Sequence, residues 1–307
     1  MKCEIPRYLE SYYKEENDLM PNQSGAGNCL LNKALLKPIE YPGLIRLGPN
    51  GDGGYVIPGD QIKSCELLIS LGLSDNWLFD KEFLARNPTA RVIGVDHTVG
   101  PWWFLRRMFI YLWKIPVYAL IGNRRKISKY AAKLRNCVGY FFFFREPHSH
   151  LKRRVSTSGG RLDISLGQIL DSNLGRSAQH YVFLKMDIEG SEYGVVQDIV
   201  QYQNRIRCIA AEFHDLDKRT EEFNESMQSL SQHFCIVHIH GNNGSAYDYT
   251  NDFPSAAEIT FINKSLIERD IPFSAFQYPR EGLDFPNNPG APDYRLHFEQ
   301  LTGPWSA

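Results

Sequence analysis

The amino-acid sequence predicts an α/β fold with a seven-stranded, mostly parallel sheet and helices on both faces. From about residue 65, short apolar segments alternate with segments that carry apolar residues at helical spacing, and acids or histidines directly follow several of the apolar segments. Short buried strands that alternate with helices form parallel sheets, because each crossover helix returns the chain to the same end of the sheet.

Seven segments carry the strand pattern, and we expect helices between most of them. The strand segments are ELLISLGL, RVIGVD, VGYFFFF, YVFLKMD, IRCIAAEFHD, FCIVHIHGNN and AAEITFIN. The helical spacings run from Trp77 to Arg86, from Ile164 to Leu170, from Val195 to Val200 and from Phe223 to Phe234.

The chain of 307 residues is 43% hydrophobic, which is enough for one elaborated domain with a full core. Residues 1–60 are expected to form an N-terminal cap segment, and residues 61–265 the core. A basic and aromatic insertion, residues 98–136, interrupts the core between its second and third strands. Residues 266–307 are a tail rich in Pro and Asn.

Nothing in the sequence predicts export or a membrane-spanning helix. The apolar run from Pro101 to Gly122 is interrupted by Arg106, Arg107 and Lys114, and the acidic N-terminus lacks the apolar region of a secretion signal. The six cysteines include no CxxC pair, which fits thiols in a reducing compartment. We therefore expect a cytoplasmic protein that is either soluble or membrane-peripheral.

The net charge of −1 hides a strong asymmetry. Residues 101–161 contain fourteen Lys or Arg and a single acid, Glu146, whereas the rest of the chain contains 20 Lys or Arg and 34 Asp or Glu. Such a segment is typical of contact with an anionic partner.

Three interpretations of the segment PWWFLRRMFIYLWK stay open. Residues 101–135 could lie on an anionic membrane, stack on nucleic-acid bases, or pack as a core with solvated arginines. A nucleic acid is the least favoured partner, since the chain has no aromatic RNA-binding motif. A lipid-linked or phosphate-bearing glycan would also account for the charge.

The first strand-to-helix turn and the end of the second strand form a candidate cofactor site. Ligands of doubly wound sheets bind beyond the carboxyl ends of the strands. Gly72 in SLGLSD lets the backbone approach a ligand, and Ser74 can cap the next helix. Asp96 ends the second strand about 24 residues later, where an acid can accept both ribose hydroxyls, and His97 follows it.

Two longer segments resemble a known family. ISLGLSDNWLFDKEFLARNPTARVIGVDHT is similar to the first two strands of FkbM-type methyltransferases, and LKMDIEGSEYGVV resembles their fourth strand with its Lys-x-Asp-x-Glu-Gly-x-Glu signature. GDGGYV, AAEFHD and HIHGNN also resemble one branch of that family. The resemblance covers about residues 45–97 and 160–263.

The resemblance implies a class I, Rossmann-like methyltransferase fold whose last strand is antiparallel. It also implies S-adenosyl-L-methionine as cofactor and O-methylation of a hydroxyl group on a sugar or glycan. Gly72, Ser74 and Asp96 are the cofactor-binding residues that it implies, with Tyr55 and His97 beside them.

Polar side chains follow the fourth, fifth and sixth strands. An alkyl hydroxyl needs a proton acceptor before it can attack a sulfonium methyl group. Asp187, Glu189, His214 and His240 are the expected catalytic residues. Glu212, at the end of the fifth strand, is interpreted as a structural partner.

Two other interpretations of these residues stay open. A divalent cation, Mg or Mn, could bind Asp187, His214 and either His238 or His240, although we favour catalysis without metal, because magnesium sites seldom contain several histidines. Asp187 and Glu189 could instead cap the helix that starts near Ser191, and His238 could be a hydrogen-bonded core residue.

Two other classes of function compete with sugar methylation. The basic segment is also compatible with a ribose 2'-O-methyltransferase or a nucleic-acid-binding protein. The histidines are compatible with a metal-dependent hydrolase, but the HExxH spacing is absent.

Overall fold

The computed structural model describes residues 29–173, 181–268 and 271–298. Leu31–Ala307 forms one compact unit, and the description below concerns this unit.

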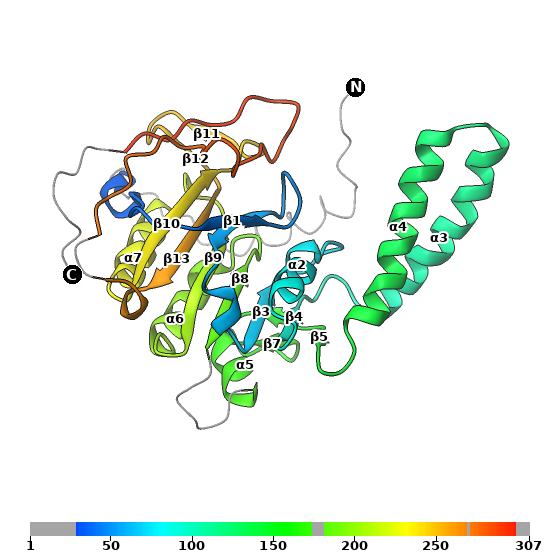
Figure 1. Ribbon diagram of the computed structural model, residues 1–307, viewed down its shortest axis with the longest axis horizontal. Coiled ribbons are helices and arrows are strands. Elements are labelled where there is room, and N and C mark those ends of the chain that lie inside the picture. Colours follow the sequence, from blue (N-terminus) through cyan, green and yellow to red (C-terminus); the bar gives the residue numbers. More distant parts are fainter. Residues whose placement is uncertain (1–28, 174–180, 269–270, 299–307) are drawn as a thin grey trace. The chain divides into compact units, whose positions relative to one another are not determined.

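A seven-stranded sheet lies at the centre, with the strand order β10-β13-β9-β8-β3-β4-β5 (Figure 1). Its strands are β3 (Leu67–Leu71), β4 (Arg91–Val95), β5 (Ser149–Leu151), β8 (Val182–Met186), β9 (Ile206–Phe213), β10 (Phe234–Gly241) and β13 (Ala257–Asn263). Only β13 pairs antiparallel, with both β9 and β10. This is the mostly parallel, Rossmann-like sheet that was predicted, so the predicted fold class is confirmed.

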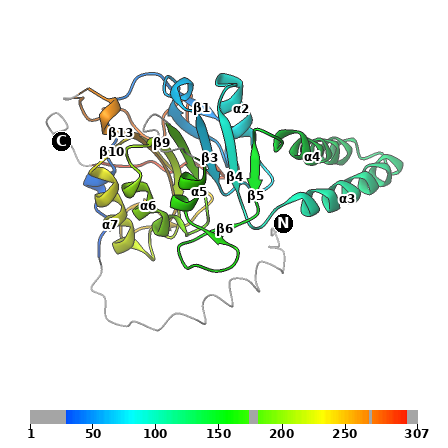
Figure 2. The same cartoon turned by 90° about the horizontal axis from the view of Figure 1, so that it is seen from below.

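Helices and a small hairpin cover the two faces of the sheet (Figure 2). One face carries α2 (Leu78–Arg86) and the hairpin of β1 (Leu44–Leu47) and β2 (Tyr55–Pro58), and the other carries α5 (Leu166–Asn173), α6 (Val196–Gln201) and α7 (Thr220–Ser231). Neighbouring strand residues such as Leu68 and Ile69 are fully buried on opposite faces. Each face therefore has its own apolar core.

Short elements connect these layers. They are β6 (Arg154–Val155), β7 (Asp163–Ile164), β11 (Tyr247–Asp248), β12 (Phe253–Pro254) and the 3-10 helices η1 (Lys33–Leu36), η2 (Ile62–Ser64), η3 (Glu192–Val195) and η4 (Lys264–Leu266). The helix predicted from Ile164 starts later, because Ile164 belongs to β7.

The predicted insertion forms a helical hairpin of α3 (Pro101–Leu120) and α4 (Arg124–Phe143), which extends away from the sheet (Figures 1 and 2). The prediction of VGYFFFF as the third strand is wrong, since most of it belongs to α4 and the third strand is β5. Tyr140 stacks on Phe104 of α3 with 4.0 Å between ring centroids and also contacts Trp77. Packing between helices therefore overrides the strand preference of aromatic residues.

The tail lies across the ends of β10 and β13. Asn287 Nδ2 donates a hydrogen bond to Glu258 Oε1 at 2.7 Å, and Asn243 Nδ2 donates to the carbonyl of Asn288 at 3.0 Å. None of the helices in the described part of the chain is long and apolar enough to span a membrane. Residues 1–28 of the predicted N-terminal cap lie outside the described residues.

Candidate functional site

The turn after β3 is pressed against the end of β8. Gly72 has a φ of +80°, and a Cβ atom there would lie 1.6 Å from the backbone oxygen of Asp187. The Lys185 Nζ atom donates a hydrogen bond to the Gly72 carbonyl oxygen at 3.0 Å. Only glycine fits this position, and its contact joins the predicted cofactor turn to the predicted catalytic strand end.

Asp96 holds the same turn in place. Its Oδ2 atom accepts hydrogen bonds from the backbone N–H groups of Leu73 (3.0 Å) and Ser74 (2.7 Å), and its Oδ1 atom accepts two from Thr98 at 2.6 Å. Burial alone would raise the pKa of Asp96, but the hydrogen bonds from Thr98 and Ser74 lower it. Asp96 is therefore an ionised residue that preorganises the turn.

The other predicted cofactor residues lie in two places. Ser74 and His97 are exposed on either side of Asp96. Tyr55 is 1% exposed, and its hydroxyl donates a hydrogen bond to Asp187 Oδ2 at 3.3 Å. Tyr55 thus lies beside Asp187. The predicted cofactor contacts of all five residues stay predictions.

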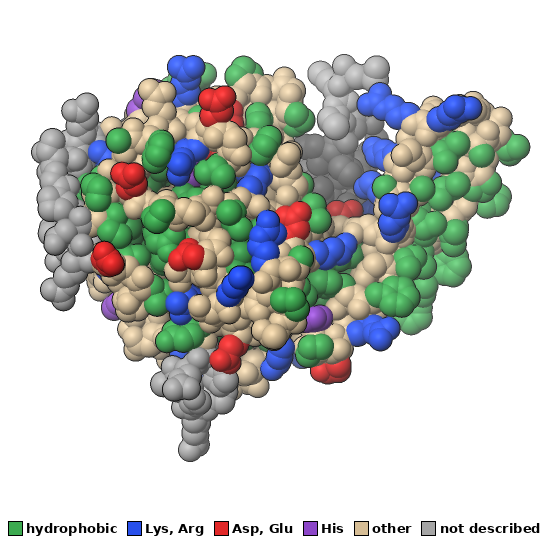
Figure 3. Space-filling model, in the orientation of Figure 1, with side chains coloured by type: hydrophobic (Ala, Val, Ile, Leu, Met, Phe, Trp, Pro, Cys, Tyr) green, Lys and Arg blue, Asp and Glu red, His purple; other side chains and the backbone are tan. Residues whose placement is uncertain are grey.

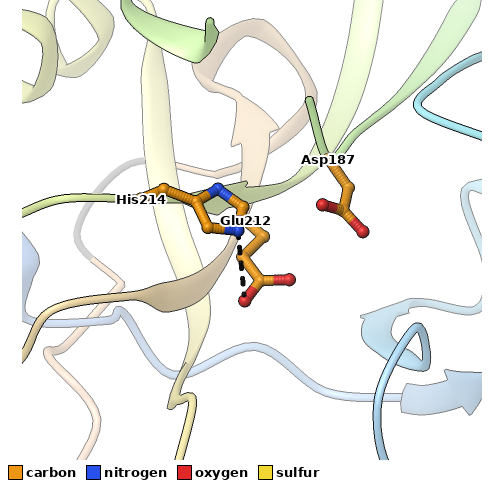
Figure 4. Close-up of side chains that lie close together, drawn as sticks. All are labelled: Asp187, Glu212 and His214. Carbon is orange, nitrogen blue, oxygen red and sulfur yellow. Dashed lines mark ion pairs between the residues drawn. The ribbon is translucent and has the colours of Figure 1, made fainter. Parts of the chain in front are cut away.

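Asp187, Glu212 and His214 converge beyond β8 and β9, and we call them the acid–imidazole cluster (Figure 4). One ligand-type atom from each residue lies within 4.8 Å of the others. Asp187 directly follows β8, Glu212 is the penultimate residue of β9, and His214 directly follows β9. The cluster forms because these two strands are parallel neighbours and end at the same edge of the sheet.

His214 is surrounded by carboxylates. Its Nδ1 atom lies 3.1 Å from Glu192 Oε1, and its Nε2 atom lies 3.6 Å from Glu189 and 3.8 Å from Glu212. Burial alone would lower its pKa, but the hydrogen bond to Glu192 and the neighbouring carboxylates raise the pKa to about 10. A histidine with so high a pKa carries a proton at neutral pH, and the catalytic role of His214 stays a prediction.

Glu192 is a site residue that the sequence interpretation missed, although it is the last acid of the strand-four signature. It is fully buried, and its Oε1 atom accepts from the backbone N–H groups of Ile188 and Gly190 as well as facing His214. Glu192 therefore fills the loop-capping role that we had considered for Asp187 and Glu189. The Glu189 side chain is 76% exposed.

Asp187 is the accessible carboxylate of the cluster. Its side chain is 22% exposed, and its Oδ2 atom lies 4.0 Å from Lys185 Nζ. Because it combines accessibility with close contact to Gly72 and Tyr55, Asp187 can reach a bound substrate at the carboxyl edge of the sheet.

Two further acids face this edge. Glu258 of β13 stands opposite Glu212 in the strand register, and Asn242 Nδ2 donates to Glu212 Oε1 at 2.5 Å. Burial and the carboxylates of Asp187 and Glu258 raise the pKa of Glu212 well above its usual value. Desolvation and the same two carboxylates also raise the pKa of Asp52, which belongs to the GDGGYV segment. The site thus contains more carboxyl groups than the sequence analysis assigned to it.

His240 is not one of the three residues of the acid–imidazole cluster, and its predicted catalytic role stays a prediction. It is 1% exposed, with Nδ1 lying 3.2 Å from Glu258 Oε2 and Nε2 lying 2.9 Å from Asp293 Oδ2. Against the effect of burial, these carboxylates raise its pKa to about 10. His238 is buried too, with Nε2 at 2.8 Å from Asp284 Oδ1, so its interpretation as a hydrogen-bonded core histidine is confirmed.

A cavity of about 250 Å³ lies at the opposite edge of the sheet, near the start of β10. Its lining includes Leu35, Met227 and Phe273 and no carboxylate. It therefore offers none of the acid–base chemistry of the acid–imidazole cluster.

Comparison with known proteins shows distant similarity of structure alone. No protein-family model and no curated protein matches the sequence. Among solved structures, the chain is similar to precorrin-6y C5,15-methyltransferase from Geobacter metallireducens GS-15, with 12% identity over 64% of this chain and 80% of that one and a TM-score of 0.32. It is also similar to a putative methyltransferase from Thermobifida fusca YX, with 11% identity over 67% and 77% of the two chains and a TM-score of 0.32. Similarity at this level carries no conclusion about activity, and membership of the FkbM family stays a prediction.

Proposed function

We propose that the chain is an S-adenosylmethionine-dependent O-methyltransferase that acts on a hydroxyl group of a sugar or glycan. One observation carries the proposal: the Gly72 turn, where the nucleoside of a cofactor is expected, lies directly against Asp187, the accessible carboxylate of the acid–imidazole cluster. A cofactor bound across the turn would therefore have a proton acceptor beside it.

The turn fits such a cofactor. Two hydrogen bonds to Asp96, from the N–H groups of Leu73 and Ser74, fix its backbone, so little conformational entropy would be lost on binding. Ser74 and His97 are exposed beside Asp96, where they can contact a ribose or an adenine ring. When bound, S-adenosylmethionine supplies an electrophilic methyl group.

The protein's own contribution is orientation and proton transfer. The acceptor oxygen forms the new O–C bond as the C–S bond breaks, and the hydroxyl proton passes to Asp187. The His214 imidazolium and Lys185 stabilise the carboxylates around the reacting groups.

The polar groups at this edge support a polyhydroxylated acceptor. Asp52 and Asp187 offer carboxylate oxygens, and Asn242 lies at the same edge, bonded to Glu212. Carboxylates accept hydrogen bonds from vicinal hydroxyl groups, which sugars present in pairs. A phosphate-bearing or lipid-linked sugar would in addition fit the basic segment nearby.

The acid–imidazole cluster also favours a second mechanism, in which a divalent cation assists the reaction. Glu212 takes the place that we had expected for His238 or His240 in such a ligand set. Metal analysis of the purified protein, with methyl transfer measured before and after chelation, tests this variant. Loss of activity on chelation and its recovery with Mg²⁺ or Mn²⁺ would replace Asp187 as free base with a metal-assisted step.

Isothermal titration with S-adenosylmethionine tests the proposed function. We expect the wild type to bind, and the Asp96→Asn variant to bind about tenfold more weakly or worse, because the ribose loses a charged acceptor. The Thr98→Val variant is the matched control: it removes one hydrogen bond to the Asp96 carboxylate and leaves the Asp96 charge and its bonds to the turn. If the wild-type protein had no affinity for the cofactor, the proposal would be refuted. A separate screen of methyl transfer to saccharides and RNA identifies the acceptor class.

A further inference from the structure

Helix α3 exposes large apolar side chains along its length. Trp102 is 80% exposed, Phe109 65%, Trp113 74% and Leu120 89%. They are spaced by seven, four and seven residues, so they lie on one face of the helix. Further exposed apolar residues of the hairpin are Leu112, Val117, Ile121, Phe141 and Phe142.

The opposite face of α3 is already used for packing. Phe104 and Tyr111 are buried against α4, where Tyr111 and Tyr118 both stack on Tyr130. The exposed side chains are therefore not needed to hold the two helices together. A continuous exposed apolar surface of this kind marks an interaction site.

The hairpin is also strongly basic. Residues 101–143 contain nine Lys or Arg and no Asp or Glu. Figure 3 shows hydrophobic side chains along α3 and Lys and Arg side chains along α4. Arg124 and Arg125 follow Leu120 and Ile121 at the tip of the hairpin, so cations lie next to the most exposed apolar residues.

We propose that the α3–α4 hairpin docks on the surface of an anionic lipid bilayer, with the apolar face of α3 inserted at the headgroup boundary. Aliphatic and aromatic side chains enter that boundary, while neighbouring Lys and Arg contact acidic headgroups. Charge complementarity favours a lipid surface over a second copy of the chain, because two hairpins would bring eighteen cations together without an acid. The exposed Leu120 and Ile121 would gain little from nucleic acid, which offers phosphates and bases but no apolar phase.

The base of the hairpin is fixed to the candidate site. Trp77, directly before α2, packs edge-on against Phe104 with 5.4 Å between centroids, and Asn136 Nδ2 donates to the Asp75 carbonyl oxygen at 2.5 Å. A docked hairpin would therefore keep the carboxyl edge of the sheet close to the lipid. Docking itself needs no catalysis and does not rest on the proposed function.

Co-sedimentation of the full chain with unilamellar vesicles tests the proposal. We expect binding to vesicles of phosphatidylcholine with 30% phosphatidylglycerol, weaker binding to phosphatidylcholine alone, and weakening by salt. The triple variant Phe109→Ser, Trp113→Ser, Leu120→Ser should bind at least about tenfold more weakly, and so should Arg124→Glu with Arg125→Glu.

Matched substitutions outside the hairpin serve as controls. Tyr249→Ser removes an aromatic side chain that is 89% exposed. Lys63→Glu reverses the charge of an exposed residue outside the hairpin. Both variants should bind vesicles as the wild type does. Circular dichroism confirms that each variant is folded. The proposal is overturned if the wild type ignores anionic vesicles, if the hairpin variants bind equally well, or if the apolar substitutions instead abolish self-association or RNA binding.

Discussion

The candidate site and the α3–α4 hairpin are opposites in charge and in how they are built. Asp187 and Glu212 come from different strands, are buried or half-buried, and lie close to His214, and Glu258 of a third strand stands opposite Glu212. The hairpin is local in sequence, basic and largely exposed. Although the net charge is −1, the protein has an acidic candidate site and a basic surface, and a different ligand is expected at each.

The difference teaches where substitutions should matter. Buried charges that depend on one another are costly to break, whereas exposed charges and apolar residues contribute little to folding. Changes at the site should affect activity and stability, and changes on the hairpin should affect binding to a surface.

The largest difference is expected in catalysis. Asp187→Asn should slow methyl transfer by about 10²- to 10⁴-fold, because the proton acceptor is lost, while cofactor affinity stays within about threefold. The hairpin variant Trp113→Ser should leave kcat with a soluble acceptor unchanged. Steady-state kinetics and cofactor titration measure both, with Asp217→Asn as a matched exposed-acid control. Full activity of Asp187→Asn would remove Asp187 from the mechanism.

Two glycines with positive φ, one in each region, allow the backbone of the site to be compared with that of the hairpin. Gly72→Ala should destabilise the fold by at least about 3 kcal/mol, because its Cβ would overlap the Asp187 carbonyl oxygen. Gly122→Ala in the hairpin turn should cost only about 1–2 kcal/mol of strain, since no described atom lies within 4 Å of its Cβ. Urea denaturation of both variants is the measurement. Equal losses would mean that the Gly72 turn is not pressed against β8.

Ion pairs in the two regions should also differ. Glu192→Gln leaves the His214 cation without its buried partner and should lower the free energy of unfolding by about 3 kcal/mol. Lys133→Gln breaks a half-exposed pair with Asp75 at the base of the hairpin, at 3.9 Å, and should cost less than about 1 kcal/mol. Chemical denaturation at pH 7 compares them, and a larger loss for Lys133→Gln would contradict this account.

Stability should also depend on pH. The pKa of His240 is raised from 6.5 to about 10 in the folded state, so its contribution to stability is complete below about pH 6.5 and is lost as the pH rises toward 10. His240→Gln should flatten the decline in unfolding free energy over this range. If His240→Gln kept the wild-type dependence of unfolding free energy on pH, the contacts of His240 with Glu258 and Asp293 would not raise its pKa.

Local patterns predicted the sheet well, because its strands are short apolar runs that end in polar residues. They failed at VGYFFFF, where Tyr140 packs on Phe104, about 36 residues earlier in the chain. The sequence left open whether the aromatic side chains of α3 form a core or an exposed surface, because the burial of each side chain depends on how α3 packs against α4.

The site was predicted in part for a similar reason. Asp187 and His214 follow from strand ends. Asp293 and Asp284 come from the tail and contact His240 and His238 in a way that no spacing rule contains. Glu192 carried a signal in the strand-four signature, but its buried contact with His214 required the fold.

A structure with S-adenosylhomocysteine bound tests the central claim most directly. The account predicts a ribose at Asp96 and the Gly72 turn, with the sulfur atom facing Asp187. A ligand bound elsewhere, or a sulfur atom directed away from the acid–imidazole cluster, would contradict it.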